Sequence, residues 1–110
     1  MAGYYELKRS GENGYMFNLM AGNNETILTS QIYAAKDGAQ DGIVSVQANS
    51  PLDERFERKV AKDDSVYFVL NAANRLTIGT SEMYSSASAR DKGIESVRAN
   101  GGTKTIKEIA

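Results

Sequence analysis

Hydroxyl side chains precede both predicted helices at matching points of the sequence. Thr29-Ser30 is followed three residues later by Tyr33, and Thr80-Ser81 by Tyr84. Hydroxyls together with free backbone N–H groups at a helix start suit a phosphate or a carboxylate. The same residue types also end a strand and cap a helix, which is the more common role for them. We therefore keep an anion site as a hypothesis and favour capping.

The second of these two places offers the fuller set of polar groups. Arg90 lies in the predicted helix there and could add a positive charge, although a solvated helix face is its favoured role. The candidate anion-binding residues are Tyr84, Ser85, Ser86 and Arg90.

Several kinds of chemistry are excluded by composition. The chain has no histidine and no cysteine, so it has no Ser-His-Asp triad, thiolate nucleophile or thiolate metal site. We expect no catalytic residues, no metal and no cofactor. The alternative is an enzyme that uses carboxylates, Lys59 or serine hydroxyls near Tyr84. A net charge of −1 makes nucleic acid an unlikely partner.

The elements that must position these residues repeat along the chain. Positions 5–50 and 56–101, compared at a shift of 51 residues, are identical at 17 of 46 pairs, where chance would give roughly three. A repeated unit of this length usually cannot bury its own apolar face and packs on the other copy. The two repeats should therefore share one core.

Each copy is predicted to form three strands and a helix. Alternating apolar residues indicate strands, for example at Phe17 and Leu19 in the first copy. The period then changes to that of a helix, whose apolar stripe comprises Ala39, Ile43 and Val46 in the first copy and Ile94 and Val97 in the second.

Glycines mark two features of these predicted helices. Gly42 and Gly93 lie inside them, where glycine is unfavourable, so we expect a close approach between helix and sheet. Asn100-Gly101 predicts a left-handed helix end.

The pattern predicts an α+β fold. Two tandem βββα(β) repeats form one antiparallel sheet, with both helices packed on one face and a pseudo-twofold axis between the copies. We expect one domain over 1–110, built of repeats 5–50 and 56–101, with a C-terminal edge strand over 103–109 whose lysines protect the edge.

These residues resemble the YegP-like family of small bacterial proteins. The resemblance covers essentially the whole chain and is carried by the runs Ile78–Ala87, Arg90–Val97, Asp53–Glu57 and Ile27–Ser30. It implies that the last strand of each unit is exchanged onto the other. It also implies that the duplication replaces the homodimer of single-copy members, and it brings no biochemical activity. The first copy departs from the motif at Gln31–Ala35.

A second candidate surface is the sheet face opposite the helices. If Phe17 and Phe68 face the helices, the other face presents Met16, Met20, Tyr67 and Val69. Such residues suit a contact surface, and they equally suit ordinary scattered exposure.

The function favoured by the sequence is a non-catalytic binding or interaction module. Its partner would be a protein or a small anionic ligand, with no membrane involved, and the chain would be a monomer containing an internal pseudo-dimer. No apolar run in Met1–Met20 predicts a signal or a membrane span, so a cytoplasmic protein is expected.

Overall fold

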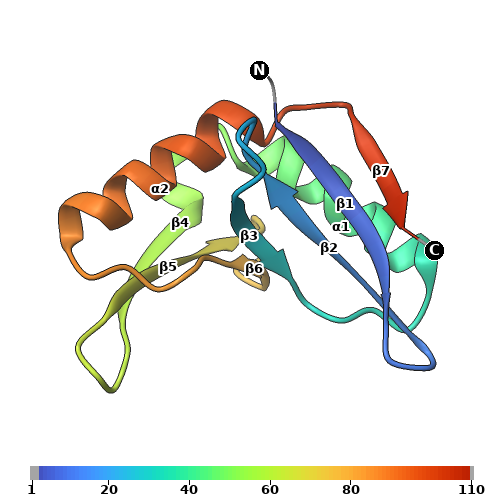
Figure 1. Ribbon diagram of the computed structural model, residues 1–110, viewed down its shortest axis with the longest axis horizontal. Helices are drawn as coiled ribbons and strands as arrows, with labels where there is room; N and C mark the ends of the chain where they lie inside the picture. Colours follow the sequence, from blue (N-terminus) through green and yellow to red (C-terminus); the bar gives the residue numbers. More distant parts are fainter. Residues whose placement is uncertain (1–2, 110) are drawn as a thin grey trace.

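Two copies of a strand–strand–strand–helix unit follow one another in the computed structural model, which describes residues 3–109 (Figure 1). The first copy consists of β1 (Tyr4–Ser10), β2 (Gly14–Met20), β3 (Thr26–Ser30) and α1 (Lys36–Asn49). After the 3-10 turn η1 (Asp53–Arg55), the second copy consists of β4 (Phe56–Val60), β5 (Val66–Asn71), β6 (Thr77–Thr80) and α2 (Ala87–Asn100), and β7 (Ile106–Ile109) ends the described chain.

All seven of these strands lie in one twisted sheet, in the order β4-β5-β6-β3-β2-β1-β7. The two copies meet at its centre, where β3 pairs with β6 and Thr29 faces Thr80. These two threonines are 51 residues apart and hold the same position in each repeat. The predicted pseudo-twofold axis is therefore confirmed, and it passes between them.

The sheet is mixed, which corrects the antiparallel sheet predicted from the sequence. Five of the strand pairs are antiparallel, but β7 runs parallel to β1. The reason is that α2 ends beside the start of β1, where Thr103 donates a hydrogen bond to the Gly3 carbonyl and Tyr5 N–H donates to the Thr105 carbonyl. A strand that begins next to the start of β1 and follows it runs in the same direction.

The exchange of strands between repeats is confirmed. The strand that follows α1 is β4, and it pairs with β5 of the second copy. The strand that follows α2 is β7, and it returns to pair with β1 of the first copy. Figure 1 shows β7, in red, beside β1, in blue.

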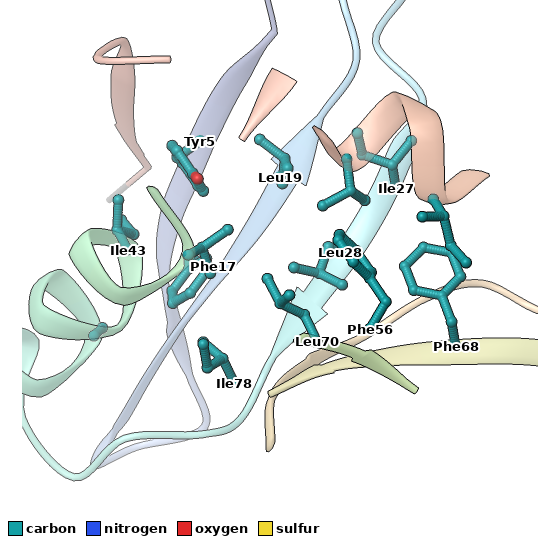
Figure 2. Packing of buried hydrophobic residues seen from close by; sticks show 14 of the residues in the cluster. Tyr5, Phe17, Leu19, Ile27, Leu28, Ile43, Phe56, Phe68, Leu70 and Ile78 are labelled. Atoms are coloured by element: carbon teal, nitrogen blue, oxygen red, sulfur yellow. The ribbon is translucent and has the colours of Figure 1, made fainter. Parts of the chain in front are cut away.

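Both helices cover the same face of the sheet and each contacts strands of both repeats. α1 packs on β1 and β2 and also on β5 and β6, while α2 packs on β5 and also on β2 and β3. Figure 2 shows side chains of both copies, such as Phe17 and Leu70, pointing into one apolar cluster. The predicted helix stripe is confirmed, because Ala39, Ile43, Val46, Ile94 and Val97 are all buried.

A tyrosine lies between each helix and the sheet. The ring of Tyr33 stacks on Phe17 with centroids 6.3 Å apart, and Tyr84 stacks on Phe68 with the same spacing. A Cβ added to Gly42 would meet the Tyr33 hydroxyl, and one added to Gly93 would meet that of Tyr84. The close approach predicted at both helix glycines is thus confirmed, and the tyrosine ring is what makes it close.

The left-handed helix end predicted at Asn100-Gly101 is wrong. Gly101 has φ −62° and ψ −24°, in the right-handed region, and its N–H donates to the Val97 carbonyl at 2.7 Å. The helical hydrogen bonding thus continues through Gly101, so the chain does not reverse there.

Candidate functional site

The open face of the sheet is less exposed than the sequence suggested. Met20 and Val69 lie on this face, but their relative solvent exposures are only 8% and 5%. Met16 and Tyr67 are half-buried. Asn18, which is also buried, donates a hydrogen bond to Thr29 at 2.9 Å in the middle of this face. No helix or strand among residues 3–109 covers the face, and its role in binding stays a prediction.

The hydroxyls before the helices serve the fold. Ser81 accepts a hydrogen bond from the Phe68 N–H at 3.0 Å and donates to the Glu82 carbonyl at 2.8 Å. Ser30 makes the same two bonds in the first copy, to Phe17 N–H and the Gln31 carbonyl. Each serine hydroxyl thus ties strand β2 or β5 to the loop that leads into the helix.

The start of α2 is also internally satisfied. Ser86 is its N-cap and accepts from the Ala89 N–H at 3.1 Å, while Ser85 is exposed. Arg90 donates to Asp91, whose pKa is lowered by this hydrogen bond first and by Arg58 second. The half-buried Tyr84 has a raised pKa because burial disfavours its charged form. Binding at these four candidate residues stays a prediction.

The residues of the alternative enzyme hypothesis are not brought together. Lys59 faces Tyr67 across β4 and β5 on the open side of the sheet and pairs with Glu57 at 3.6 Å. Tyr84 stacks on Phe68, on the helix side. No group of three or more metal-ligating side chains occurs within the described residues 3–109.

A cleft at the other end of the sheet brings basic side chains together, and we call it the β1–β7 cleft. Its volume is about 360 Å³. It is lined by Leu7, Lys8, Arg9, Tyr15, Lys36, Glu108 and Ile109. The strand β7 forms one wall, so the cleft exists only because β7 is exchanged onto the first repeat.

Positive charge exceeds negative charge in this cleft. Two cationic side chains, those of Arg9 and Lys36, lie on its helix-facing side against one carboxylate, that of Glu108, which lies 2.5 Å from the Lys36 ammonium. This hydrogen bond raises the pKa of Lys36, so the group remains an ammonium ion. Lys8 contributes only to the wall of the cleft, because it faces Met16 in the strand register and its side chain therefore points to the open face of the sheet.

Aromatic and backbone groups complete the β1–β7 cleft. The Arg9 guanidinium lies 5.6 Å from the centre of the Tyr15 ring and donates to the Glu12 carbonyl at 2.7 Å. The helix α1 begins at Lys36, and its N-cap residue Ala35 offers no side-chain hydrogen bond. The partial positive charge of this helix start adds to that of Arg9 and Lys36 and is opposed by Asp37 in the first turn.

The second repeat has no equivalent of this cleft. The counterparts of Arg9, Tyr15 and Lys36 are Val60, Val66 and Ala87. Sequence reasoning did not single out the cleft, because Lys8, Lys36 and Glu108 are far apart in the chain and only the parallel pairing of β7 with β1 joins them. The signal available in the sequence is that Arg9 and Lys36 have no basic counterparts in the second copy.

These features define a class of protein: a duplicated α+β unit with an exchanged strand, a basic cleft and, among the described residues, no group of three or more potential metal ligands. No helix in the part of the chain that the structure describes is long and apolar enough to span a bilayer.

The chain belongs to the family described as "Domain of unknown function (DUF1508)", which matches it twice, at residues 11–57 and 61–108. It is 55% identical to a UPF0339 protein of Shewanella oneidensis, over 99% of both chains. It is 51% identical to the UPF0339 protein YegP of Escherichia coli K12, over 98% of both. The resemblance seen in the sequence is thereby confirmed.

Solved structures agree with the fold. The solution NMR structure of the Shewanella oneidensis UPF0339 protein has a TM-score of 0.92 and 56% identity, over 98% of this chain and 92% of that one. The solution NMR structure of the Escherichia coli protein of unknown function YegP also has a TM-score of 0.92, with 51% identity, over 98% and 93% of the two chains. These relatives are described without a biochemical activity, so the function of the family is unknown.

Proposed function

We propose that the protein is a non-catalytic binding module that takes a small organic anion in the β1–β7 cleft. We also propose that residues 1–110 act as one domain and that a single chain is the binding unit. The internal pairing of the repeats supports this, since each helix already packs on strands of both copies. The cytoplasm is the proposed location, because a chain without cysteine suits a reducing compartment.

The excess of positive charge in the cleft is the observation that carries the proposal. Lys36 is neutralised by Glu108, which leaves Arg9 without a carboxylate partner within residues 3–109. A bound anion would supply the missing negative charge, with the start of α1 adding to the attraction.

The walls of the cleft favour an anion that has an apolar part. Leu7, Tyr15 and Ile109 line it beside the cations, and its volume falls in the range of small-molecule sites. A carboxylate or phosphate ester would place its charged end at Arg9 and its apolar body on Leu7 and Tyr15. Because Lys36 is held as an ammonium ion, it serves as a fixed charge and not as a nucleophile.

An NMR titration tests this function, with phenyl phosphate as the probe. We expect saturable shifts of the backbone signals of Lys8, Arg9, Tyr15 and Lys36. The variant Arg9→Gln should weaken binding by about tenfold or more. Its matched control is Lys8→Gln, because Lys8 is the adjacent cation in β1 and its side chain lies on the opposite face of the sheet.

The result that contradicts the proposal is equally specific. Shifts that do not saturate, or equal affinity in Arg9→Gln and in the unmodified protein, would show that the β1–β7 cleft is not the site.

A further inference from the structure

A second cleft, which we call the η1 cleft, lies where η1 and β4 meet the turn between β5 and β6. Its volume is about 590 Å³. It is lined by Glu54, Arg55, Phe56, Glu57, Asn71, Ala72, Ala73 and Arg75. It belongs to the second repeat and is separate from the β1–β7 cleft, since the two have no lining residue in common.

In the first repeat, the two segments that correspond to the walls of the η1 cleft contact each other directly. There Tyr4 donates a hydrogen bond to the Asn24 side chain at 2.8 Å, which joins the two segments. The counterparts of Tyr4 and Asn24 in the second repeat are Arg55 and Arg75. The contact between the segments is thus replaced by two guanidinium groups.

Neither arginine has an ionic partner within residues 3–109. Arg55 donates its Nε–H to the Asn49 side chain at 2.9 Å, and no carboxylate pairs with it or with Arg75. The two outer nitrogens of Arg55 remain available, and they can hold both oxygens of a carboxylate.

The backbone at Arg75 makes the arginine there unexpected. Its φ is +70°, the left-handed region, and Asn24 has the same φ in the first repeat. Asparagine adopts this conformation readily, whereas a long side chain such as arginine is disfavoured there. Asparagine would therefore suit the turn better, which is consistent with a role for the Arg75 side chain outside the turn.

One lining carboxylate is also unpaired. Glu57 accepts a hydrogen bond from Asn71 at 3.2 Å and lies 3.6 Å from the Lys59 ammonium, so its charge is balanced. Glu54 is exposed and makes no ion pair or side-chain hydrogen bond within residues 3–109. The unbalanced charges of the η1 cleft are therefore two guanidinium groups and one carboxylate.

We propose that the η1 cleft binds an acidic amino acid, whose charges are the complement of this set. Arg55 and Arg75 each take one carboxylate of the ligand, and Glu54 takes its ammonium group. These three ion pairs fix the orientation of the ligand in the cleft. They also select against ligands that lack one of the two carboxylates or the ammonium group.

Titration with L-glutamate, followed by NMR of the full chain, tests the proposal. We expect saturable shifts at Arg55, Ala73 and Arg75. L-Glutamine, N-acetyl-L-glutamate and glutarate each lack or mask one charged group and should bind about tenfold or more weakly. Glutarate or N-acetyl-L-glutamate binding as tightly as L-glutamate would overturn the assignment, as would the absence of any saturable shift.

The duplication supplies a matched variant. Arg55→Tyr/Arg75→Asn installs the pair found at Tyr4 and Asn24. It should abolish glutamate binding while the melting temperature changes little, because asparagine suits the left-handed position at residue 75 and this offsets the loss of the Arg55–Asn49 hydrogen bond. Loss of binding could then not be attributed to unfolding, and retained binding would overturn the proposal. Arg9→Gln, which tests the β1–β7 cleft, should leave glutamate binding unchanged, so the two proposals can fail independently.

Discussion

Ser50 and Gly101 hold the same position in the two repeats and lie against each other where the ends of α1 and α2 meet. A Cβ added to Gly101 would collide with the Ser50 side chain. The Ser50 hydroxyl is fully buried and has no hydrogen-bond partner within the described residues. Two equivalent residues that contact each other lie at the pseudo-twofold axis. The space between Ser50 and Gly101 accommodates the Ser50 side chain but no second side chain.

Gly101→Ala should therefore destabilise the protein. We expect the free energy of unfolding to fall by about 1–3 kcal/mol, because a methyl group is forced into a filled space. Urea denaturation measures the change. Adding Ser50→Gly to the same chain should restore most of the loss, since it vacates the other side of the axis.

Strict additivity of Gly101→Ala and Ser50→Gly would contradict this account of the contact. Ser50→Ala is a useful companion variant. It removes a buried hydroxyl that has no partner, so it should leave stability unchanged or raise it by about 1 kcal/mol.

Gly42→Ala and Gly93→Ala should each lower stability, although alanine is favoured over glycine in a helix by about 1 kcal/mol. The added methyl group would meet the hydroxyl end of Tyr33 or Tyr84 and displace its ring. We expect a net loss of about 1–3 kcal/mol, measured as a shift of the urea midpoint.

Gly38→Ala is the matched control for these two variants. It lies in the same helix as Gly42, and its added Cβ would be 3.4 Å from the Tyr33 ring, an ordinary contact. The second repeat already has Ala89 at this position. Stability should therefore rise by about 0.5–1 kcal/mol. Equal effects at Gly38 and Gly42 would argue against the tyrosine contact.

Most of the fold was predictable, because the duplication and the periodic spacing of apolar residues can both be read directly from the sequence. The stripe Ala39, Ile43 and Val46 is spaced at a helical period, and the resemblance supplied the exchange of strands. The direction of β7 was not predictable. It depends on where α2 ends relative to β1, a contact made by Tyr5 with residues about 100 positions away.

The candidate clefts were not predictable for a related reason. The sequence drew attention to Ser81 and Ser86, whose hydroxyls turn out to bond the backbone of neighbouring residues. Arg9 and Arg75 have no carboxylate partner within residues 3–109, and the absence of a partner is a property of the folded chain. A pattern of residue types reports which groups exist and not which of them remain unsatisfied.

Tyr5→Phe should have an effect that depends on pH. Tyr5 is buried and donates to the Gly101 carbonyl at 2.5 Å, while its counterpart Phe56 has no hydroxyl. At neutral pH the variant should lose about 1 kcal/mol, the net value of one hydrogen bond.

Burial raises the pKa of Tyr5 above its ordinary value of 10.0. The stability due to its protonated hydroxyl is therefore fully present below pH 10 and is lost as the pH rises, because the unfolded chain releases the proton first. The difference between Tyr5→Phe and the unmodified protein should shrink above pH 10. Urea denaturation from pH 7 to about pH 11 checks this, and a constant difference across that range would contradict it.

Separation of the two repeats should abolish folding of each. In fragment 1–52, α1 would lose its contacts with β5 and β6, and β1 would lose β7; in fragment 53–110, α2 would lose β2 and β3. Each fragment is also near the size at which a single core becomes marginal. We expect neither to melt cooperatively by circular dichroism.

An equimolar mixture should recover a cooperative transition whose midpoint rises with concentration, because the exchanged strand and the shared core then form between two chains. Two fragments that each melt cooperatively as monomers would show that the repeats do not depend on one another.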